Sequence, residues 1–137
     1  MRTAKILAGE ALSPMLEVFH SISGQILASA RKVETEGSVD RLVLGFGAVT
    51  LVISADENDD TVNITLSETP DLAGLDISHL EPWRNLTGRP FGWGWVTVNQ
   101  QGYCDGLLLS FGGIVPLLAL NVIASSIKVG VITMVAQ

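Results

Sequence analysis

The sequence predicts an α+β fold: a single domain over residues 1–137, with a strongly bent antiparallel sheet of about seven or eight strands and two short helices. Three observations predict it. Eight short stretches are rich in apolar and β-branched residues and are separated by turn residues. Two other stretches have helical spacing or helix-end signals. The 137 residues, 47% of them hydrophobic, match the length and composition of one packed domain.

The first helix is predicted to start at Ser13-Pro14, with Ser13 as the N-cap and Pro14 at the first helical position. Gly24 is suited to end it. Apolar residues recur between these points at helical spacing: Leu12, Met15, Leu16, Phe19 and Ile22. Residues 26–34 then predict a strand, although a continuing helix also fits them.

Three strands follow, at residues 41–46, 48–54 and 62–66, because their apolar residues alternate with polar ones or form short runs. The loop between the last two resembles the start of a calcium loop, with Asp56, Asn58 and Asp60 at the first three side-chain positions. However, Thr61 and Ser67 stand where such a loop needs Gly and Glu. We therefore expect a solvated turn and no metal.

Residues 69–78 are expected to be irregular, and residues 79–86 to form the second helix with Gly88 as its cap. A hairpin over 91–99 and 103–111 follows, then strands over 115–123 and 127–135. Residues 106–127 carry no charge and could span a bilayer by length. Gly112-Gly113 and Pro116 break this stretch, which favours two buried strands and no membrane helix.

The chain is acidic, with 14 Asp and Glu against 8 Lys and Arg and a net charge of −6. This charge repels nucleic acid and favours a basic protein partner. Cys104 is the sole cysteine, so no internal disulfide can form. Because Glu10 interrupts the first apolar run too early for a signal peptide, we expect a cytoplasmic protein.

No residue pattern indicates an enzyme, a metal site or a cofactor. His20 and His79 have no Cys or His at metal spacing. Cys104 is followed by Asp105, whose carboxylate would raise the pKa of the thiol. The glycines around Phe46 and Trp93 form no phosphate loop and instead predict strand bending or close packing against aromatic rings.

The aromatic residues of the second half are the strongest candidates for a binding site. Trp93 and Trp95 share one strand face, and Tyr103 is expected across the hairpin. Aromatic residues beside Arg and Asn are typical of binding surfaces. The alternative is that they form core, with an Arg–Asp pair fixing the hairpin. The candidate binding residues are Trp83, Arg84, Arg89, Trp93, Trp95, Asn99, Tyr103 and Asp105.

Two motifs in this half carry a family resemblance: W-x-x-L-x-G from Trp83 to Gly88, and N-x-x-G-Y-x-D from Asn99 to Asp105. With Trp95 and Ser125-Ser126-Ile127, they resemble a family of small bacterial proteins of unknown function. The resemblance implies a bacterial cytosolic origin and an α+β fold, and it supplies no catalytic residue. Small acidic proteins of this kind are often immunity or partner-binding proteins, which is an analogy.

Three functions follow as hypotheses. The first is an immunity-like interaction module that binds a basic protein. The second is a small-molecule-binding domain that uses Trp83, Trp93, Trp95 and Tyr103, and the third is an enzyme. Separately, the last strand could pair with a second copy if it lies at a sheet edge, since Ile127, Val129, Val131 and Thr133 share one face.

Overall fold

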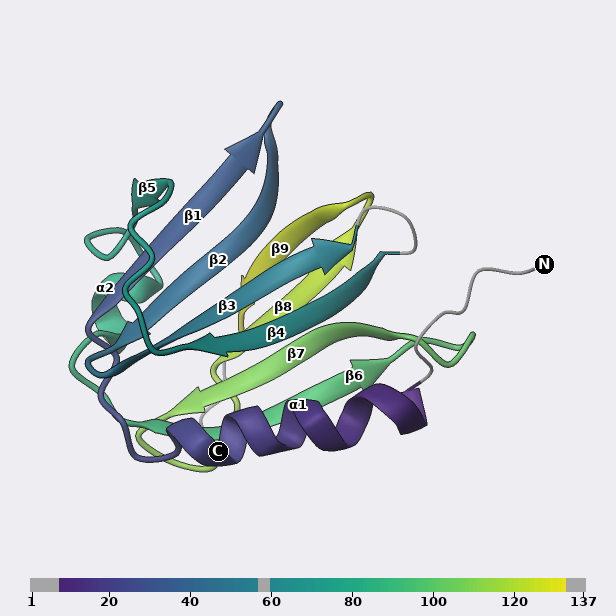
Figure 1. Ribbon diagram of the computed structural model, residues 1–137, viewed down its shortest axis with the longest axis horizontal. Coiled ribbons are helices and arrows are strands. Elements are labelled where there is room, and N and C mark those ends of the chain that lie inside the picture. The colour runs from purple at the N-terminus through teal and green to yellow at the C-terminus, as the bar shows by residue number, and fades with distance from the viewer. Residues whose placement is uncertain (1–7, 57–59, 133–137) are drawn as a thin grey trace.

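The computed structural model describes residues 8–56 and 60–132, which form two antiparallel sheets and two helices (Figure 1). The first sheet has the order β4-β3-β2-β1-β5 and the second the order β6-β7-β8-β9. The first comprises β1 (Ser29–Thr35), β2 (Ser38–Phe46), β3 (Val49–Asp56), β4 (Thr61–Ser67) and β5 (Leu75–Asp76). The second comprises β6 (Phe91–Val98), β7 (Cys104–Phe111), β8 (Leu118–Ile123) and β9 (Ser126–Val131). The helices are α1 (Ala8–Ile22) and α2 (Trp83–Leu86).

The predicted α+β class, the antiparallel strands and the two helices are confirmed, and the sheet arrangement differs in two ways. The described residues contain nine strands in two sheets, in place of seven or eight in one bent sheet. The strand that was not predicted is β5, which has two residues and lies inside the stretch expected to be irregular. Alternating patterns fix which side chains are buried, but a stacked pair of sheets buries the same faces as one bent sheet.

Helix α1 begins at Ala8, so the prediction that Ser13 caps it is wrong and Pro14 lies inside the helix. Its buried face consists of Met15, Phe19 and Ile22, as the spacing predicted. The helix ends after Ile22, and Gly24 adopts φ +83° and donates its N–H to the Phe91 carbonyl at 2.8 Å. Residues 29–35 form β1, so the helix does not continue into them.

The core lies between the sheets, where β2 packs on β9 and β4 on β7. Three phenylalanines surround Phe91 there. The ring centroid of Phe91 lies 5.9 Å from that of Phe19, 6.1 Å from that of Phe46 and 5.7 Å from that of Phe111. Helix α1 covers the side of this sandwich at β6 and β4 (Figure 1). The shorter α2 buries Trp83 and Leu86.

The uncharged stretch from 106 to 127 forms β7, a turn region and β8, as predicted. In the described parts of the chain, none of the helices has both the length and the apolar character that crossing a membrane requires. The last strand, β9, is an edge strand, as its proposed pairing requires. Thr133 of the predicted strand lies outside the described residues, and pairing with a second copy stays a prediction.

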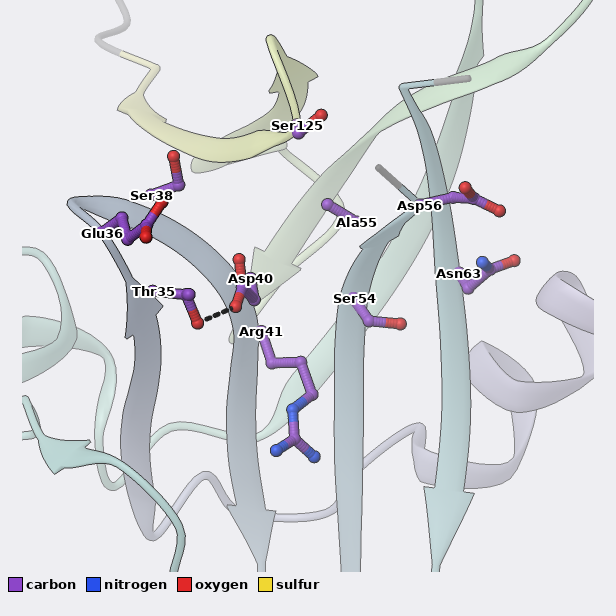
Figure 2. A pocket seen from close by; sticks show the side chains of 10 residues that line it. All are labelled: Thr35, Glu36, Ser38, Asp40, Arg41, Ser54, Ala55, Asp56, Asn63 and Ser125. Atoms are coloured by element: carbon purple, nitrogen blue, oxygen red, sulfur yellow. Dashed lines mark hydrogen bonds between the residues drawn. The ribbon is translucent and has the colours of Figure 1, made fainter. Parts of the chain in front are cut away.

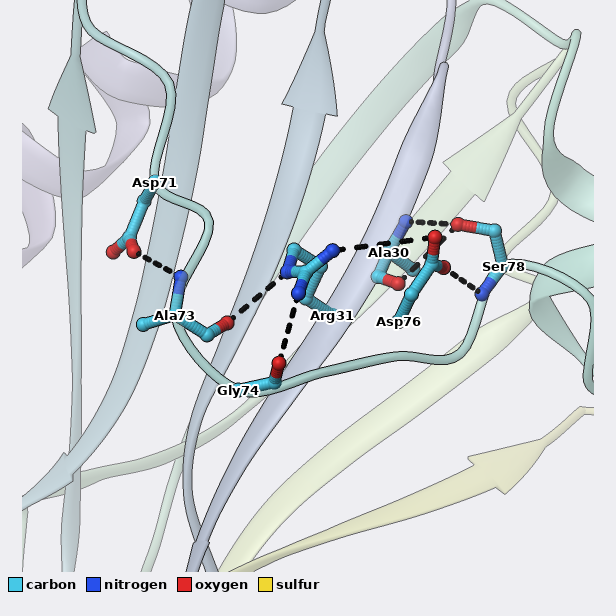
Figure 3. Close-up of polar contacts among 7 residues, drawn as sticks. All are labelled: Ala30, Arg31, Asp71, Ala73, Gly74, Asp76 and Ser78. Atoms are coloured by element: carbon cyan, nitrogen blue, oxygen red, sulfur yellow. Dashed lines mark hydrogen bonds and ion pairs between the residues drawn. The ribbon is translucent and has the colours of Figure 1, made fainter.

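Residues 68–74, which we call the strap, cross the outer face of the five-stranded sheet between β4 and β5 (Figure 3). Arg31 donates from Nε to the Ala73 carbonyl at 3.1 Å and from Nη2 to the Gly74 carbonyl at 2.8 Å. Arg41 pairs with Asp71 at 3.6 Å. Beneath the strap Val43 is only 2% exposed although it points to the outer side of the sheet.

Candidate functional site

The outer face of the four-stranded sheet presents a row of apolar and small residues, which we call the tryptophan face: Trp93, Trp95, Leu108, Ala119 and Gly130. Trp95 pairs with Leu108, Leu108 with Ala119, and Ala119 with Gly130, so four of them lie side by side across all four strands. Their neighbours along the strands point inward to the core. Trp93 and Gly130 are exposed at the two ends of the row, and Trp95, Leu108 and Ala119 between them are half-buried.

Trp93 is 56% exposed and stacks on Trp95, with ring centroids 6.4 Å apart and planes 25° from parallel. The prediction that these two rings share a strand face is therefore confirmed. Trp95 is half-buried, so it supports the more exposed ring. A rigid stacked pair loses little conformational entropy when it is covered, which suits it to binding.

A bulge in β6 places Trp93 at the corner between the sheet face and α1. The pairing register with β7 shifts between Phe91 and Gly94, and the Trp93 N–H is donated to Ser110 Oγ at 2.7 Å. A Cβ at Gly94 would lie 2.5 Å from the Phe19 ring. The predicted close packing of a glycine against an aromatic ring is thus confirmed at Gly94.

A largely apolar cavity of about 350 Å³ lies beside Trp93, between α1 and β6. Leu16, Phe19 and His20 line its helix side, and Gly92 and Gly94 its strand side. His20 is exposed at this cavity and has no described partner at metal spacing. The cavity extends the apolar surface of Trp93 toward the helix.

The candidates of the β6–β7 turn hold that turn together. Asn99 Oδ1 accepts hydrogen bonds from the backbone N–H groups of Gln101 at 2.9 Å and Tyr103 at 3.2 Å. Asp105 Oδ1 accepts from Thr97 Oγ1 at 3.3 Å on the facing strand. The Arg–Asp pair considered for this hairpin does not occur among the ion pairs of the described residues. Asn99 and Asp105 thus shape the hairpin that carries Trp95.

The remaining candidates lie elsewhere, because α2 is at the other edge of the sheet. Trp83 is 3% exposed and lines a cavity beside β9, not the one beside Trp93. Arg84 pairs with Glu81 at 2.5 Å. Arg89 is exposed and forms no ion pair within residues 8–56 and 60–132. Hence the eight candidates divide among the tryptophan face, the β6–β7 turn and the α2 region.

A polar cavity of about 670 Å³, which the sequence did not indicate, opens where several hairpin turns meet (Figure 2). Glu36, Asp40 and Asp56 contribute carboxylates, and Arg41 extends along the sheet away from the turns. Asp40 accepts a hydrogen bond from Thr35, and Arg41 is already paired with Asp71. We call this the acidic end; it concentrates negative charge at one end of the molecule.

The two sheets are joined beside the acidic end. Asp60 Oδ1 accepts the Ser125 N–H at 2.8 Å, and Ser126 Oγ accepts the Val39 N–H at 3.0 Å. Asp60 is therefore bound to the turn between β8 and β9. Asn58, the middle residue of the calcium-like pattern, lies outside the described residues.

Comparison with known protein families assigns the chain to one of them. Residues 13–136 match the model of a family described as "Family of unknown function (DUF6334)". The chain belongs to this family. No curated protein and no solved structure matches it. The predicted resemblance to a family of unknown function is confirmed at that level, while the bacterial origin and the two motifs stay predictions.

Cys104 of this DUF6334 chain is a buried thiol on β7. Burial raises its pKa, and the neighbouring Asp105 carboxylate raises it further, as expected from the sequence. The thiol therefore stays protonated at neutral pH and is a poor nucleophile. Within the described parts of the chain, no group of three or more His, Cys, Asp and Glu side chains is arranged to hold a metal ion.

Proposed function

We propose that this DUF6334 protein is a non-catalytic protein-interaction module that docks through the tryptophan face. The observation that carries the proposal is Trp93, which is 56% exposed and stacks on Trp95 on the outer face of the four-stranded sheet. Exposed apolar patches of this kind mark interaction sites, and tryptophan dominates binding energy at many interfaces. A half-buried companion ring holds the anchor in place.

The partner we propose is a basic protein, in the manner of an immunity protein that masks its target in the bacterial cytoplasm. The net charge of −6 attracts basic surfaces over a distance, and the acidic end concentrates part of it. Charge of this kind mainly accelerates encounter, whereas the apolar anchor sets how long the complex lasts. Both contributions are separable by salt and by mutation.

The test is a tagged pull-down from host lysate at low and high salt, followed by mass spectrometry. The wild-type chain should capture a basic protein in stoichiometric amount at low salt and lose much of it at high salt. Trp93→Ala should lose the same protein at both salt concentrations, because the anchor is removed while the charge is unchanged.

Leu72→Ala is the matched control, since Leu72 is also an exposed apolar residue but lies on the strap. It should capture the partner as the wild type does. An empty pull-down, or equal capture by Trp93→Ala and Leu72→Ala, would show that the tryptophan face is not the docking surface.

A second candidate function is favoured by the 350 Å³ cavity beside Trp93. A small apolar ligand seated there would contact the indole and change its fluorescence. This site uses Trp93 and Trp95 but not Trp83, which lines a different cavity. Titration of a metabolite panel against wild type and Leu16→Ala tests it. The candidate fails if no compound shifts the emission, or if the Leu16 variant responds identically.

A further inference from the structure

The outer edge of β9, which pairs with no other described strand, borders a groove whose opposite wall is formed by residues 80–89. A cavity of about 360 Å³ lies between Val129 and the Leu80–Trp83 side, and one of about 240 Å³ between Val131 and the Leu86–Arg89 side. Glu81 and Pro82 line both cavities, so the two lie next to each other along the strand. We call this surface the β9 groove.

The backbone of β9 offers hydrogen-bonding groups to this groove. Ile132 donates its N–H to the Leu117 carbonyl at 2.9 Å, and Val131 stands opposite Leu118. Alternate residues of an antiparallel strand turn their backbone groups to opposite sides. The N–H and C=O groups of Val131, Val129 and Ile127 therefore point away from β8, and within the described residues no backbone bond joins them to residues 80–89.

The exposure of the side chains along this edge increases from Ile127 to Val131. Ile127 is buried, Val129 is 38% exposed and Val131 is 62% exposed, although all three point to the core side of the sheet. The buried Trp83 and Leu86 rest beneath the same groove. An added strand would cover Val129 and Val131 while its backbone paired with theirs.

The groove is positively charged although the whole chain is acidic. Lys32 and Lys128 line its first cavity and Arg89 its second. Glu81, which lines both, is neutralised by Arg84, and Lys32 by Glu34. Lys128 and Arg89 form no ion pair in the described parts of the chain, which leaves two uncompensated cations at the rim.

We propose that the β9 groove binds an extended segment of a partner protein in which acidic residues alternate with apolar ones. The segment adds to the edge of β9 as a fifth strand. Its apolar side chains lie beside Val129 and Val131, and its acidic side chains turn outward toward Lys128, with Arg89 at the groove's end. A second copy of β9 fits less well, because Ser126–Val131 contains Lys128 and no acidic residue. This site lies at the opposite edge of the four-stranded sheet from Trp93 and does not depend on the proposed function.

The test titrates the ¹⁵N-labelled full chain with two end-blocked seven-residue peptides, one alternating Val with Glu and one alternating Val with Lys. The Val-Glu peptide should shift the backbone amide signals of Ile127, Val129 and Val131 and slow their hydrogen exchange. The Val-Lys peptide should leave them unchanged, and added salt should weaken the Val-Glu complex.

Arg89→Glu should weaken binding of the Val-Glu peptide about five- to tenfold, because it replaces an attraction with a repulsion at the rim of the groove. The Arg89 side chain is exposed, so this variant should fold. The double variant Gln100→Glu/Gln101→Glu is the control, since it changes the net charge equally in the exposed β6–β7 turn. It should bind as the wild type does.

Three results would overturn the proposal. The Val-Glu peptide could fail to bind, or bind no better than the Val-Lys peptide. It could perturb Trp93 and Trp95 instead of β9. Or the peptide-free chain could be a dimer in solution with the β9 amides already protected, which would make a second copy the occupant.

Discussion

On the five-stranded sheet the strap crosses the outer face and leaves Val43 2% exposed, whereas the outer face of the four-stranded sheet leaves Trp93 56% exposed. Seven residues without regular structure cover the middle of the first face, whereas Asn63 and Thr65 on β4 stay exposed. They are held by polar contacts to Arg31 and Arg41. The two outer faces therefore differ at their centres of interest: the first is covered above Val43, and the second leaves an aromatic ring in water.

Breaking the strap should have the largest effect. Gly74 adopts φ +78°, and a Cβ there would overlap the Lys32 carbonyl group. Gly74→Ala should therefore lower the free energy of unfolding by about 2–4 kcal/mol, through overpacking and left-handed backbone strain. Urea unfolding measures it. Gly113→Ala, where the added methyl meets no heavy atom within 4 Å, should change stability by less than about 0.5 kcal/mol. Equal losses would mean that the strap is not tightly seated.

Removing Arg31, which anchors the strap, should reduce stability less than Gly74→Ala does. Arg31→Ala deletes two hydrogen bonds to strap carbonyls and a 4.0 Å ion pair with Asp76. We expect a loss of about 1–3 kcal/mol in the free energy of unfolding. Amide hydrogen exchange should accelerate in the strap before the rest of the chain. Arg89→Ala is the control without an ion pair. A strap that stays protected in Arg31→Ala would contradict its anchoring by this residue.

On the uncovered face, Trp93→Ala should cost only about 0.5–1.5 kcal/mol, roughly the value of its stacking on Trp95. This is small for a tryptophan, because more than half of the side chain is already in water. Thermal or urea unfolding checks it. A loss as large as that of Gly74→Ala would show that the tryptophan face is part of the structural core.

The smallest effect concerns the pH dependence of stability and a carboxyl group in β5, just after the strap. The Ser78 hydroxyl and the Ser78 N–H, the latter 2.8 Å from Asp76 Oδ1, lower the pKa of Asp76 below its ordinary value. The ionised carboxylate therefore stabilises the fold above the ordinary carboxyl pKa, and this contribution is lost as the pH falls through the lowered pKa. Asp76→Asn should flatten the acid-side decline of the urea midpoint slightly. Identical pH profiles for the variant and the wild type would contradict this.

Local patterns in the sequence were enough to predict most elements of the fold. Alternation located eight strands, and the buried face of α1 followed from the spacing of Met15, Phe19 and Ile22. The predicted start of α1 was wrong. Ser13-Pro14 is a strong local signal for a helix start, but the helix begins earlier, at Ala8, and continues through these residues. The stacking of two sheets could not be predicted from local patterns, since it depends on packing between strands that are distant in sequence.

The candidate site was predictable only where its residues share an element. Trp93 and Trp95 are two residues apart on one strand, which places them on one face. Trp83 is close to them in sequence but belongs to α2 at the opposite edge of the sheet. The acidic end combines the β1–β2 turn with the end of β3 and the β8–β9 turn, and only the topology brings these together.

The sole cysteine of the chain gives the protein a practical property. Cys104 is buried, and its raised pKa keeps the thiol protonated, so maleimide reagents will react with it slowly at neutral pH. A cysteine introduced at an exposed position can therefore carry a fluorophore or spin label without first replacing the native one. Labels at Leu72 on the strap and at Gln101 in the β6–β7 turn would report separately on the covered and the uncovered sheet.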